Sequence, residues 1–498
     1  MSKEDKYESP LTSRYEKSSP LLRIFSERAK TETWRQLWIW LAEAQRELGL
    51  EMVTGEMISE LKENKSNIDW DFVKAEEARI KHDVMAHNHA YGKVCPKAAG
   101  IVHLGATSCY VQDNADLIRQ RDAIDFTLKK YALVMDRLAT FAEKQIEVVT
   151  VGRTHWQTAS LTTVGKRAVS WLQDMLIPFM QLQRFRNEDM RFRGIKGATG
   201  TQDSFLTLFK GDDNKVQELD DLVTKKAGFK RHFNITGQTY PRIQVRILYF
   251  LYHLLLLGLF LLLSPLSAFG AVAQKIGKDI RFLQSHAEIM EPFEKHQIGS
   301  SAMPYKQNPM KSERVCSLAR DLMTTASKAL ATVADQGLER TLDDSAIRRS
   351  NIPDSFLLAD AILTILQNVF EGLSVPKTKV TEKVNRELPF LAFEKAMMLL
   401  TLKGANRQEA HAKIQQITHK FKEIQDRDEK AVIELSAALE DSYFDEVRND
   451  VLEAAKNSLN FTGSCVRQVR DFLRDEFRPA VRPYLDDKSG SQLSHLDV

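Results

Sequence analysis

Apolar residues recur at helical spacing along most of the chain. In TWRQLWIWLAEAQRELGL, residues 33–50, tryptophans and leucines fall on one helical face, and Gly49 is a suitable terminator. Longer patterns of the same kind run through residues 160–194, 312–336 and 354–373, and shorter ones follow in the tail. Alternation typical of strands is nearly absent. The chain is therefore predicted to be all-α, with helices long enough for a bundle.

The helical patterns divide the 498 residues into three parts, within the two to four domains expected for this length. We predict a small N-terminal helical domain over 1–107, a central helical bundle over 108–375 and a C-terminal helical domain over 376–498. The last residues, KSGSQLSHLDV, are polar and are predicted to be disordered.

One segment is apolar on every side, ILYFLYHLLLLGLFLLL at residues 247–263. As a helix it would span about 26 Å, slightly less than the hydrocarbon core of a bilayer. It stands alone in an otherwise soluble pattern, so a buried helix or a sequence artefact is favoured over a membrane span.

Charge and cysteine usage exclude some classes of function. The 70 basic and 67 acidic residues give a net charge of +3. This small excess does not indicate a protein that binds nucleic acid. The four cysteines follow no paired spacing and are interpreted as reduced thiols. The first residues contain no apolar segment of a secretory signal, so we expect a cytoplasmic protein.

Two histidine-containing segments stand out from the helical background. KHDVMAHNHA contains His82, His87 and His89, but offsets of five and two do not place imidazoles on one helical face, so a metal site is not favoured. His155, in GRTHWQTA, is either a partly desolvated acid or base or a packed side chain.

Two further segments have the composition of anion sites, although simpler interpretations exist. RGIKGATGTQ has glycines spaced as in a phosphate loop but lacks the GK[ST] ending, which favours a tight turn. LERTLDDSAIRRS groups Arg340, Ser345, Arg348 and Arg349, and arginine suits bidentate capture of a carboxylate or phosphate. A solvated charged turn is the alternative.

The segment GSSAMPYKQNPMKSE, residues 299–313, has no helical or strand period. Glycine and serines free its backbone, two prolines prevent a helix, and Lys306 and Asn308 supply donors. Idle linkers are rich in glycine and serine or in charge and do not mix residues in this way. We interpret the segment as a mobile lid that brings a nucleophile or base together with positive charge.

This loop resembles the signature GSSxMPxKxNP of the fumarase/aspartase superfamily. Within it, the chain is similar to the adenylosuccinate lyase family of animals, in segments spread over nearly its whole length. These segments are SPLTSRY, KHDVMAH, HLGATSCYVQDN, TTVGKR, FRGIKGATGTQDSFL, KAGFKRHFNITGQTYPR, RTLDDSAIRR and FTGS.

The resemblance implies the three-domain fold of that superfamily, with a long central helical bundle. It implies β-elimination of fumarate from adenylosuccinate, giving AMP, and from succinylaminoimidazole carboxamide ribotide, in purine nucleotide biosynthesis. It also implies a homotetramer with active sites shared between subunits, no metal or organic cofactor, and no nucleic-acid or membrane partner. Another fumarate-releasing lyase, such as argininosuccinate lyase, is the alternative.

The resemblance also implies roles for individual residues. Ser300 is the general base, His155 the general acid and Lys306 the source of positive charge that activates the serine. Glu313 is expected to pair with a catalytic histidine, and His82 to hold the substrate. The implied substrate contacts are Arg14, Tyr15, Lys81, His82, Asp83, Thr107, Ser108, Gln238, Asn308, Arg314, Arg340, Ser345 and Arg349. At position 81 this chain has lysine where relatives have arginine. The lysine keeps the positive charge but lacks the paired N–H donors of a guanidinium group.

The apolar segment is the main departure from this family, as an insertion at about residues 245–263. We interpret it as partly translated intron, because phenylalanine- and leucine-rich peptide is what T-rich sequence encodes. A genuine insertion is the alternative, and it would extend a bundle helix by about 21 Å.

Overall fold

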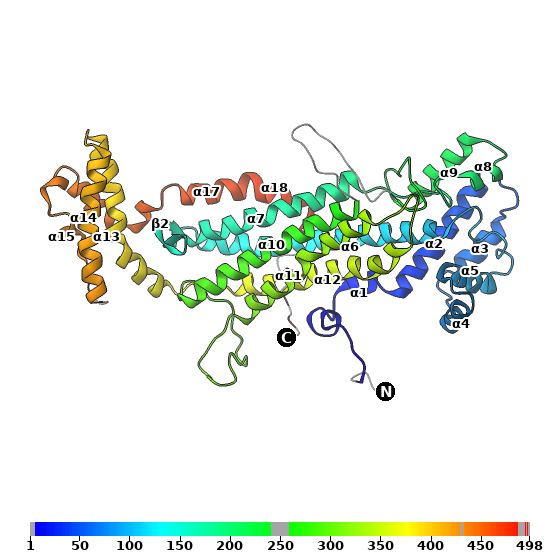
Figure 1. The fold of residues 1–498 in the computed structure, drawn as a ribbon, viewed down its shortest axis with the longest axis horizontal. Helices are drawn as coiled ribbons and strands as arrows, with labels where there is room; N and C mark the ends of the chain where they lie inside the picture. The colour runs from blue at the N-terminus through cyan, green and yellow to red at the C-terminus, as the bar shows by residue number, and fades with distance from the viewer. Residues whose placement is uncertain are drawn as a thin grey trace.

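The computed structural model describes residues 5–240, 258–428, 431, 433–486, 494 and 496. The protein is elongated, with a bundle of long helices at its centre and smaller groups of helices at its two ends (Figure 1). Apart from one two-stranded hairpin, the regular elements of the described residues are helical. The prediction of an all-α fold is confirmed.

The N-terminal end consists of short helices that start at residues suited to capping. Ser19, Ser26, Thr54 and Asp69 each accept a hydrogen bond from a backbone N–H of the first turn. The elements are the π-helical turn η2 (Leu11–Tyr15), α1 (Pro20–Ile24), α2 (Glu27–Glu47), α3 (Gly55–Glu63), α4 (Trp70–Ile80) and α5 (Asp83–Val94). The helix predicted over residues 33–50 is α2.

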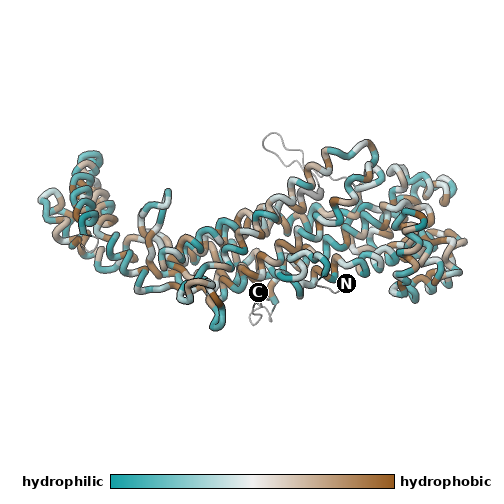
Figure 2. Tube along the Cα trace, turned by 60° about the horizontal axis from the view of Figure 1, so that its bottom comes forward, coloured by the Kyte–Doolittle hydropathy of each residue, from teal (hydrophilic) through white to brown (hydrophobic). Residues whose placement is uncertain are grey.

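Five long helices make the central bundle and lie side by side (Figure 1). They are α6 (Ser108–Lys144), α7 (Val164–Arg184), α10 (Gly258–Ser285), α11 (Met310–Ala334) and α12 (Asp343–Gly372). Tyr131 of α6 lies 5.5 Å from Phe179 of α7 and 4.6 Å from Phe269 of α10, measured between ring centroids. Hydrophobic and hydrophilic residues alternate along these helices, as expected for amphipathic elements (Figure 2). The bundle is held together by their buried apolar faces.

Between α7 and α10 the chain forms smaller elements at the N-terminal end of the bundle. They are the π-helical turn η3 (Phe185–Asp189), α8 (Asp203–Leu208) and α9 (Asp213–Lys226), and α9 packs against α2. The helix predicted to end at Gly194 therefore ends earlier, because a π-helical turn follows α7 at Phe185.

A β-hairpin follows α6 at the other end of the bundle. Strands β1 (Val149–Thr154) and β2 (Gln157–Thr163) pair antiparallel, with a bulge between Val151 and Arg153. The prediction of helix from residue 160 is wrong for its first four residues, which belong to β2. Val151 and Leu161 are buried against α13 residues, which explains why the hairpin forms.

The C-terminal helices between Lys377 and Ala455 have a small core of their own, in which Phe393 and Phe444 lie 5.6 Å apart, and those from Cys465 onward are buried in the core of the bundle. They are α13 (Lys377–Leu402), α14 (Arg407–Arg427), α15 (Leu435–Ala438), α16 (Arg448–Ala455), α17 (Cys465–Phe472) and α18 (Arg478–Val481), joined by the short turns η4 (Ser442–Phe444), η5 (Ser458–Phe461), η6 (Leu473–Phe477) and η7 (Arg482–Tyr484). The chain then returns to the bundle, where α17 lies along α7 (Figure 1). The division at residues 107 and 375 stays a prediction; both positions precede helix starts.

Residues 245–257 of the apolar segment 245–263 lie outside the described residues. The interpretation of the segment as an insertion therefore stays a prediction. Helix α10 begins at Gly258, and Leu262 and Leu263 are buried. Among the described helices, α12 alone is long and apolar enough to cross a membrane, and 78% of its apolar window is buried inside the protein. Burial of this kind is expected for a core helix. The predicted disordered tail falls outside the described residues, except Ser494 and Leu496.

Candidate active site

Most of the predicted substrate contacts meet at the start of α6. Three contacts bring four segments together: Ser108 Oγ lies 3.4 Å from His82 Nε2, Arg349 donates to Asp83 at 2.7 Å, and Arg340 donates to Gln238 at 3.0 Å. The residues gathered here are Lys81, His82, Asp83, Thr107, Ser108, Gln238, Arg340, Ser345 and Arg349. We call this group the α6 end.

The two residues after Lys81 are fixed by the start of α5. His82 is its N-cap, and its Nδ1 accepts from the backbone N–H of Met85 at 3.3 Å. Burial opposes ionisation of Asp83, but the Val84 N–H and the Arg349 guanidinium outweigh it and lower the pKa of this carboxyl. An ionised Asp83 holds Arg349 beside the pocket that Ser345 and Arg349 line.

The other histidines of this segment have structural partners. His87 is buried between Trp34 and Trp70, and burial lowers its pKa to about 4. His89 Nδ1 lies 2.7 Å from Glu76. The imidazoles of His82, His87 and His89 therefore face different neighbours.

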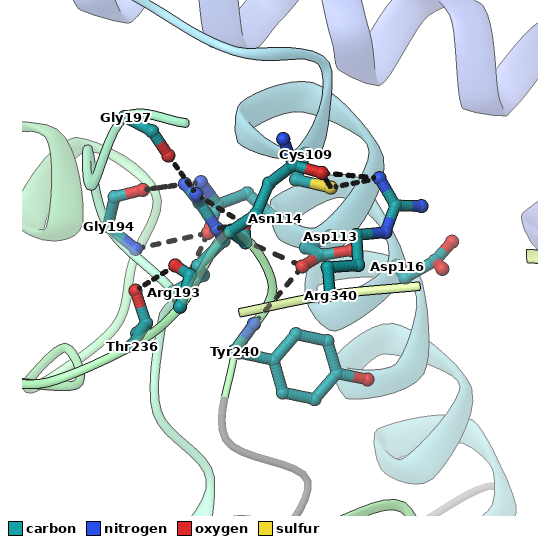
Figure 3. A network of polar contacts seen from close by, with 12 residues as sticks. Cys109, Asp113, Asn114, Asp116, Arg193, Gly194, Gly197, Thr236, Tyr240 and Arg340 are labelled. Atoms are coloured by element: carbon teal, nitrogen blue, oxygen red, sulfur yellow. Dashed lines mark hydrogen bonds and ion pairs between the residues drawn. The ribbon is translucent and has the colours of Figure 1, made fainter. Parts of the chain in front are cut away.

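Arg340 is held by two polar groups and lies beside a buried network (Figure 3). Its Nη1 donates to Gln238 Oε1 at 3.0 Å and to Cys109 Sγ at 2.8 Å. Burial raises the pKa of the Cys109 thiol to about 12, so the sulfur is a neutral acceptor. Behind them, Arg193 donates to the Gln238 carbonyl at 2.9 Å and 2.6 Å, and Asp113 accepts from the Tyr240 N–H at 3.2 Å.

The glycine-spaced segment is a set of turns rather than a phosphate loop. Gly194 and Gly197 have φ of 83° and 74°, and their carbonyls accept from Arg193. Gly200 also has positive φ, and a Cβ there would lie 1.9 Å from the Thr236 carbonyl oxygen. These glycines let the chain pack closely behind Gln238.

The signature loop lies at the opposite end of the bundle and is closed at its base. Asn308 Nδ2 donates to the Gly299 carbonyl at 2.8 Å, and a Cβ on Gly299 would lie 1.9 Å from the Lys306 carbonyl oxygen. Glu291 caps α11 by accepting from the N–H groups of Lys311 and Ser312. The loop thus projects from a fixed stem.

Within the loop, Ser300 Oγ accepts from the backbone N–H groups of Ala302 at 3.3 Å and Met303 at 3.1 Å. Two donors at the oxygen favour a negatively charged alkoxide over a neutral hydroxyl. Lys306 is exposed on the same loop. Glu313 lies 3.9 Å from Arg281. Its expected pairing with a catalytic histidine stays a prediction.

His155 lies at the exposed tip of the β-hairpin. Thr154 pairs with Gln157, so His155 and Trp156 form a two-residue turn, with φ of 51° and 65°. Positive φ at both positions is the geometry of a type I′ turn, which usually requires glycine or asparagine. Because a histidine and a tryptophan occupy it, we infer that the turn is maintained for its side chains.

The hairpin is anchored at two points that the sequence did not indicate. The Trp156 ring lies 4.4 Å from that of Phe282 on α10. Arg153 binds Glu288 through both terminal nitrogens, and Lys383 and Arg167 lie 3.4 Å and 3.9 Å from the same carboxylate. A pocket of about 720 Å³ lies beside the hairpin, lined by cationic side chains and His155. These cations are Arg153, Lys166, Arg167 and Lys275.

The end of α10 also reaches the signature loop, where Gln284 Nε2 donates to the Gln307 carbonyl at 3.0 Å. His155 and Ser300 therefore lie at the same end of the bundle, both attached to the last turns of α10. We call this the loop end.

The N-terminal residues Arg14 and Tyr15 are placed by a buried cluster. The Arg314 guanidinium lies 5.5 Å from the Tyr15 ring, which brings two predicted substrate contacts together. Next to Tyr15, Glu16 is buried and accepts from Lys130 at 3.1 Å. Burial and the nearby Asp360 carboxyl raise the pKa of Glu16 to about 7.

The α6 end and the loop end are too far apart to serve one ligand in one chain. Helix α6 has 37 residues and begins at Ser108, and the hairpin follows its last residue. At 1.5 Å per residue the helix is about 55 Å long. A substrate of nucleotide size cannot touch Ser108 and His155 of the same chain.

Comparisons with known proteins show which family the chain belongs to. A family described as Lyase matches residues 259–323, which contain the signature loop. The adenylosuccinate lyase of Caenorhabditis briggsae is 56% identical over 498 residues, with 100% of both chains covered. That of Saccharomyces cerevisiae is 44% identical over 97% of this chain and 98% of its own. This chain belongs to the adenylosuccinate lyase family. It is therefore a lyase, and the main interpretation of its function is favoured over argininosuccinate lyase.

Solved structures confirm the superfamily fold. The lactonizing enzyme for 3-carboxy-cis,cis-muconate from Pseudomonas putida superposes with a TM-score of 0.77 at 21% identity, over 93% of this chain and 97% of that one. A fumarate lyase from Mesorhizobium gives 0.76 at 18% identity, over 92% and 97%. Likeness at these identities shows the fold and nothing about the substrate.

Proposed function

We propose that the protein cleaves adenylosuccinate to AMP and fumarate, and succinylaminoimidazole carboxamide ribotide to the carboxamide ribotide and fumarate. Family membership at 56% identity to a full-length adenylosuccinate lyase carries this proposal. The proposed setting is purine biosynthesis in the cytoplasm. Four buried free thiols support that location.

In the proposed mechanism, Ser300 takes a proton from the carbon next to a carboxylate. The electrons of that C–H bond form the fumarate double bond, and the C–N bond breaks. His155 gives a proton to the departing nitrogen, so that one proton is removed and one is supplied. Two backbone N–H groups at the Ser300 oxygen, and the positive charge of Lys306, support the serine as a base.

The substrate carries two carboxylates and a phosphate, which the proposed binding residues match. Arg340 and Arg349 present guanidinium groups at the α6 end, and Arg314 does so beside Tyr15, the chain neighbour of Arg14. Arginine binds such groups through paired donors. His82 and Ser108 add polar contacts at the α6 end.

The direct test is an absorbance assay of the purified chain with adenylosuccinate. We expect loss of the succinyl-purine chromophore, with AMP and fumarate formed in equal amounts. Absence of both products in a folded preparation would reject the proposed activity. Argininosuccinate in the same assay serves as the control and is expected to remain uncleaved.

We further propose a homotetramer in which each active site combines the α6 end of one subunit with the loop end of others. The separation of about 55 Å along α6 supports it, because both groups are needed around one substrate. Arg340→Met and Ser300→Ala each remove a residue from a different end. Mixing the two impaired variants in equal amounts, under conditions that exchange subunits and at a substrate concentration well below KM, is expected to restore activity to ~25% of the wild-type value.

The mixing experiment has a built-in control. The control mixes Ser300→Ala with Lys306→Met, which are both substitutions in the signature loop. This mixture is expected to restore little activity. If Arg340→Met and Ser300→Ala also fail to complement after demonstrated subunit exchange, the shared site is excluded.

A further inference from the structure

A row of alternating buried charges leads from the core of the protein to Arg340. Arg348 Nη1 donates to Asp113 at 2.9 Å, and Arg348 Nε lies 2.9 Å from Asp344. Asp344 in turn lies 3.6 Å from Arg340 Nε. Arg193 adds a cation 3.8 Å from Asp113. The side chains of all five residues are at least nine-tenths buried.

Asp344 occupies the central position between two guanidinium groups. It lies four residues before Arg348 in the first turns of α12, so these two side chains share one face of the helix, and Arg340 lies just before the helix begins. Burial opposes the charge of Arg348, but Asp113, Asp116, Tyr240 and Asp344 outweigh it and hold its pKa well above the usual range. Without the charge of Asp344, the two buried guanidinium groups on either side of it would repel each other.

Arg340 uses only part of its donor capacity within the described residues. Nη1 serves Gln238 and Cys109, and Nε faces Asp344. Nη2 is buried and donates to none of the described residues. An enclosed guanidinium N–H without an acceptor is unfavourable, so an anionic ligand is the partner that would satisfy it.

We propose that Asp344 is a positioning residue for substrate binding: it holds the Arg340 guanidinium so that Nη2 is reserved for an anionic group of the substrate. Asp344 itself does not touch the substrate. The inference rests on the proposed function, because it takes the ligand of Arg340 to be a carboxylate or phosphate of adenylosuccinate. Cys109 and Gln238 fix the opposite side of the same guanidinium.

The test is a double-mutant cycle with steady-state kinetics on adenylosuccinate. Asp344→Asn is expected to raise KM about 10- to 100-fold, the range for loss of a charge-assisted contact, with kcat changed less than about threefold. In the Arg340→Met background, the same substitution is expected to change KM by less than about twofold. An equal rise of KM in both backgrounds would show that Asp344 acts independently of Arg340 and would overturn the proposal.

Two further variants separate positioning from folding. Glu371→Gln removes a partly buried carboxylate from the same helix, where it pairs with Arg137 at 3.2 Å, and is expected to leave KM unchanged. If Asp344→Asn does not fold as judged by its thermal midpoint, Asp344→Glu keeps the charge and moves the carboxylate by one methylene. It is then expected to raise KM in the wild-type background only. If Arg340→Met alone leaves KM unchanged, Arg340 does not bind the substrate, and this inference fails while the lyase activity stands.

Discussion

Replacing Ser300 with alanine is expected to lower kcat for adenylosuccinate cleavage about 10²- to 10⁴-fold, the range for loss of a general base. The hydroxyl is the proposed proton acceptor, and no other hydroxyl of the loop has its two backbone donors. Substrate binding, measured by titration of the inactive variant, is expected to remain within about tenfold of wild type because the arginines proposed to bind the carboxylates and the phosphate lie outside the loop.

The neighbouring Ser301 provides a matched control for this substitution. It is exposed on the same loop and has the same side chain. Ser301→Ala is expected to keep kcat within about threefold of wild type. If both variants lose activity equally, the loss comes from the conformation of the loop, and Ser300 is not the base.

Several of the long helices could be predicted from the sequence because their burial follows the helical period. Helices α2, α11 and α12 each bury one stripe or more of apolar residues, and all three were predicted. The hairpin was not predicted, because its second strand begins with four residues that are exposed or half-buried. Residues 149–164 are rich in threonine and valine, and these β-branched residues could have indicated strands.

The residues of the candidate site came from the resemblance, and the sequence could not give their arrangement. Nothing in the spacing of His82, Gln238 and Arg340 indicates that they meet at the start of α6. Contacts over 100 residues or more, such as that between Arg340 and Gln238, depend on how the helices pack. The role inferred for Asp344 was missed for the same reason, since an aspartate in LERTLDDSAIRRS is indistinguishable from a solvated turn residue.

Replacing His155 with glutamine is expected to lower kcat about 10²- to 10⁴-fold, because an amide cannot supply a proton to the departing nitrogen. His286 offers a matched control. Its imidazole lies 4.4 Å from the same Phe282 ring that Trp156 contacts, and it is exposed. His286→Gln is expected to keep kcat within about threefold of wild type.

The turn geometry allows a second test that separates proton donation from hairpin structure. Because His155 has φ of 51°, His155→Gly preserves a conformation that glycine adopts freely. The hairpin then keeps its attachments through Trp156 and Arg153 while the imidazole is missing. Added imidazole is expected to restore part of kcat in His155→Gly, with a pH dependence that follows the protonated fraction of the added acid. If His155→Gln retains full activity, or if imidazole acts equally on the wild type, the proton must come from another group.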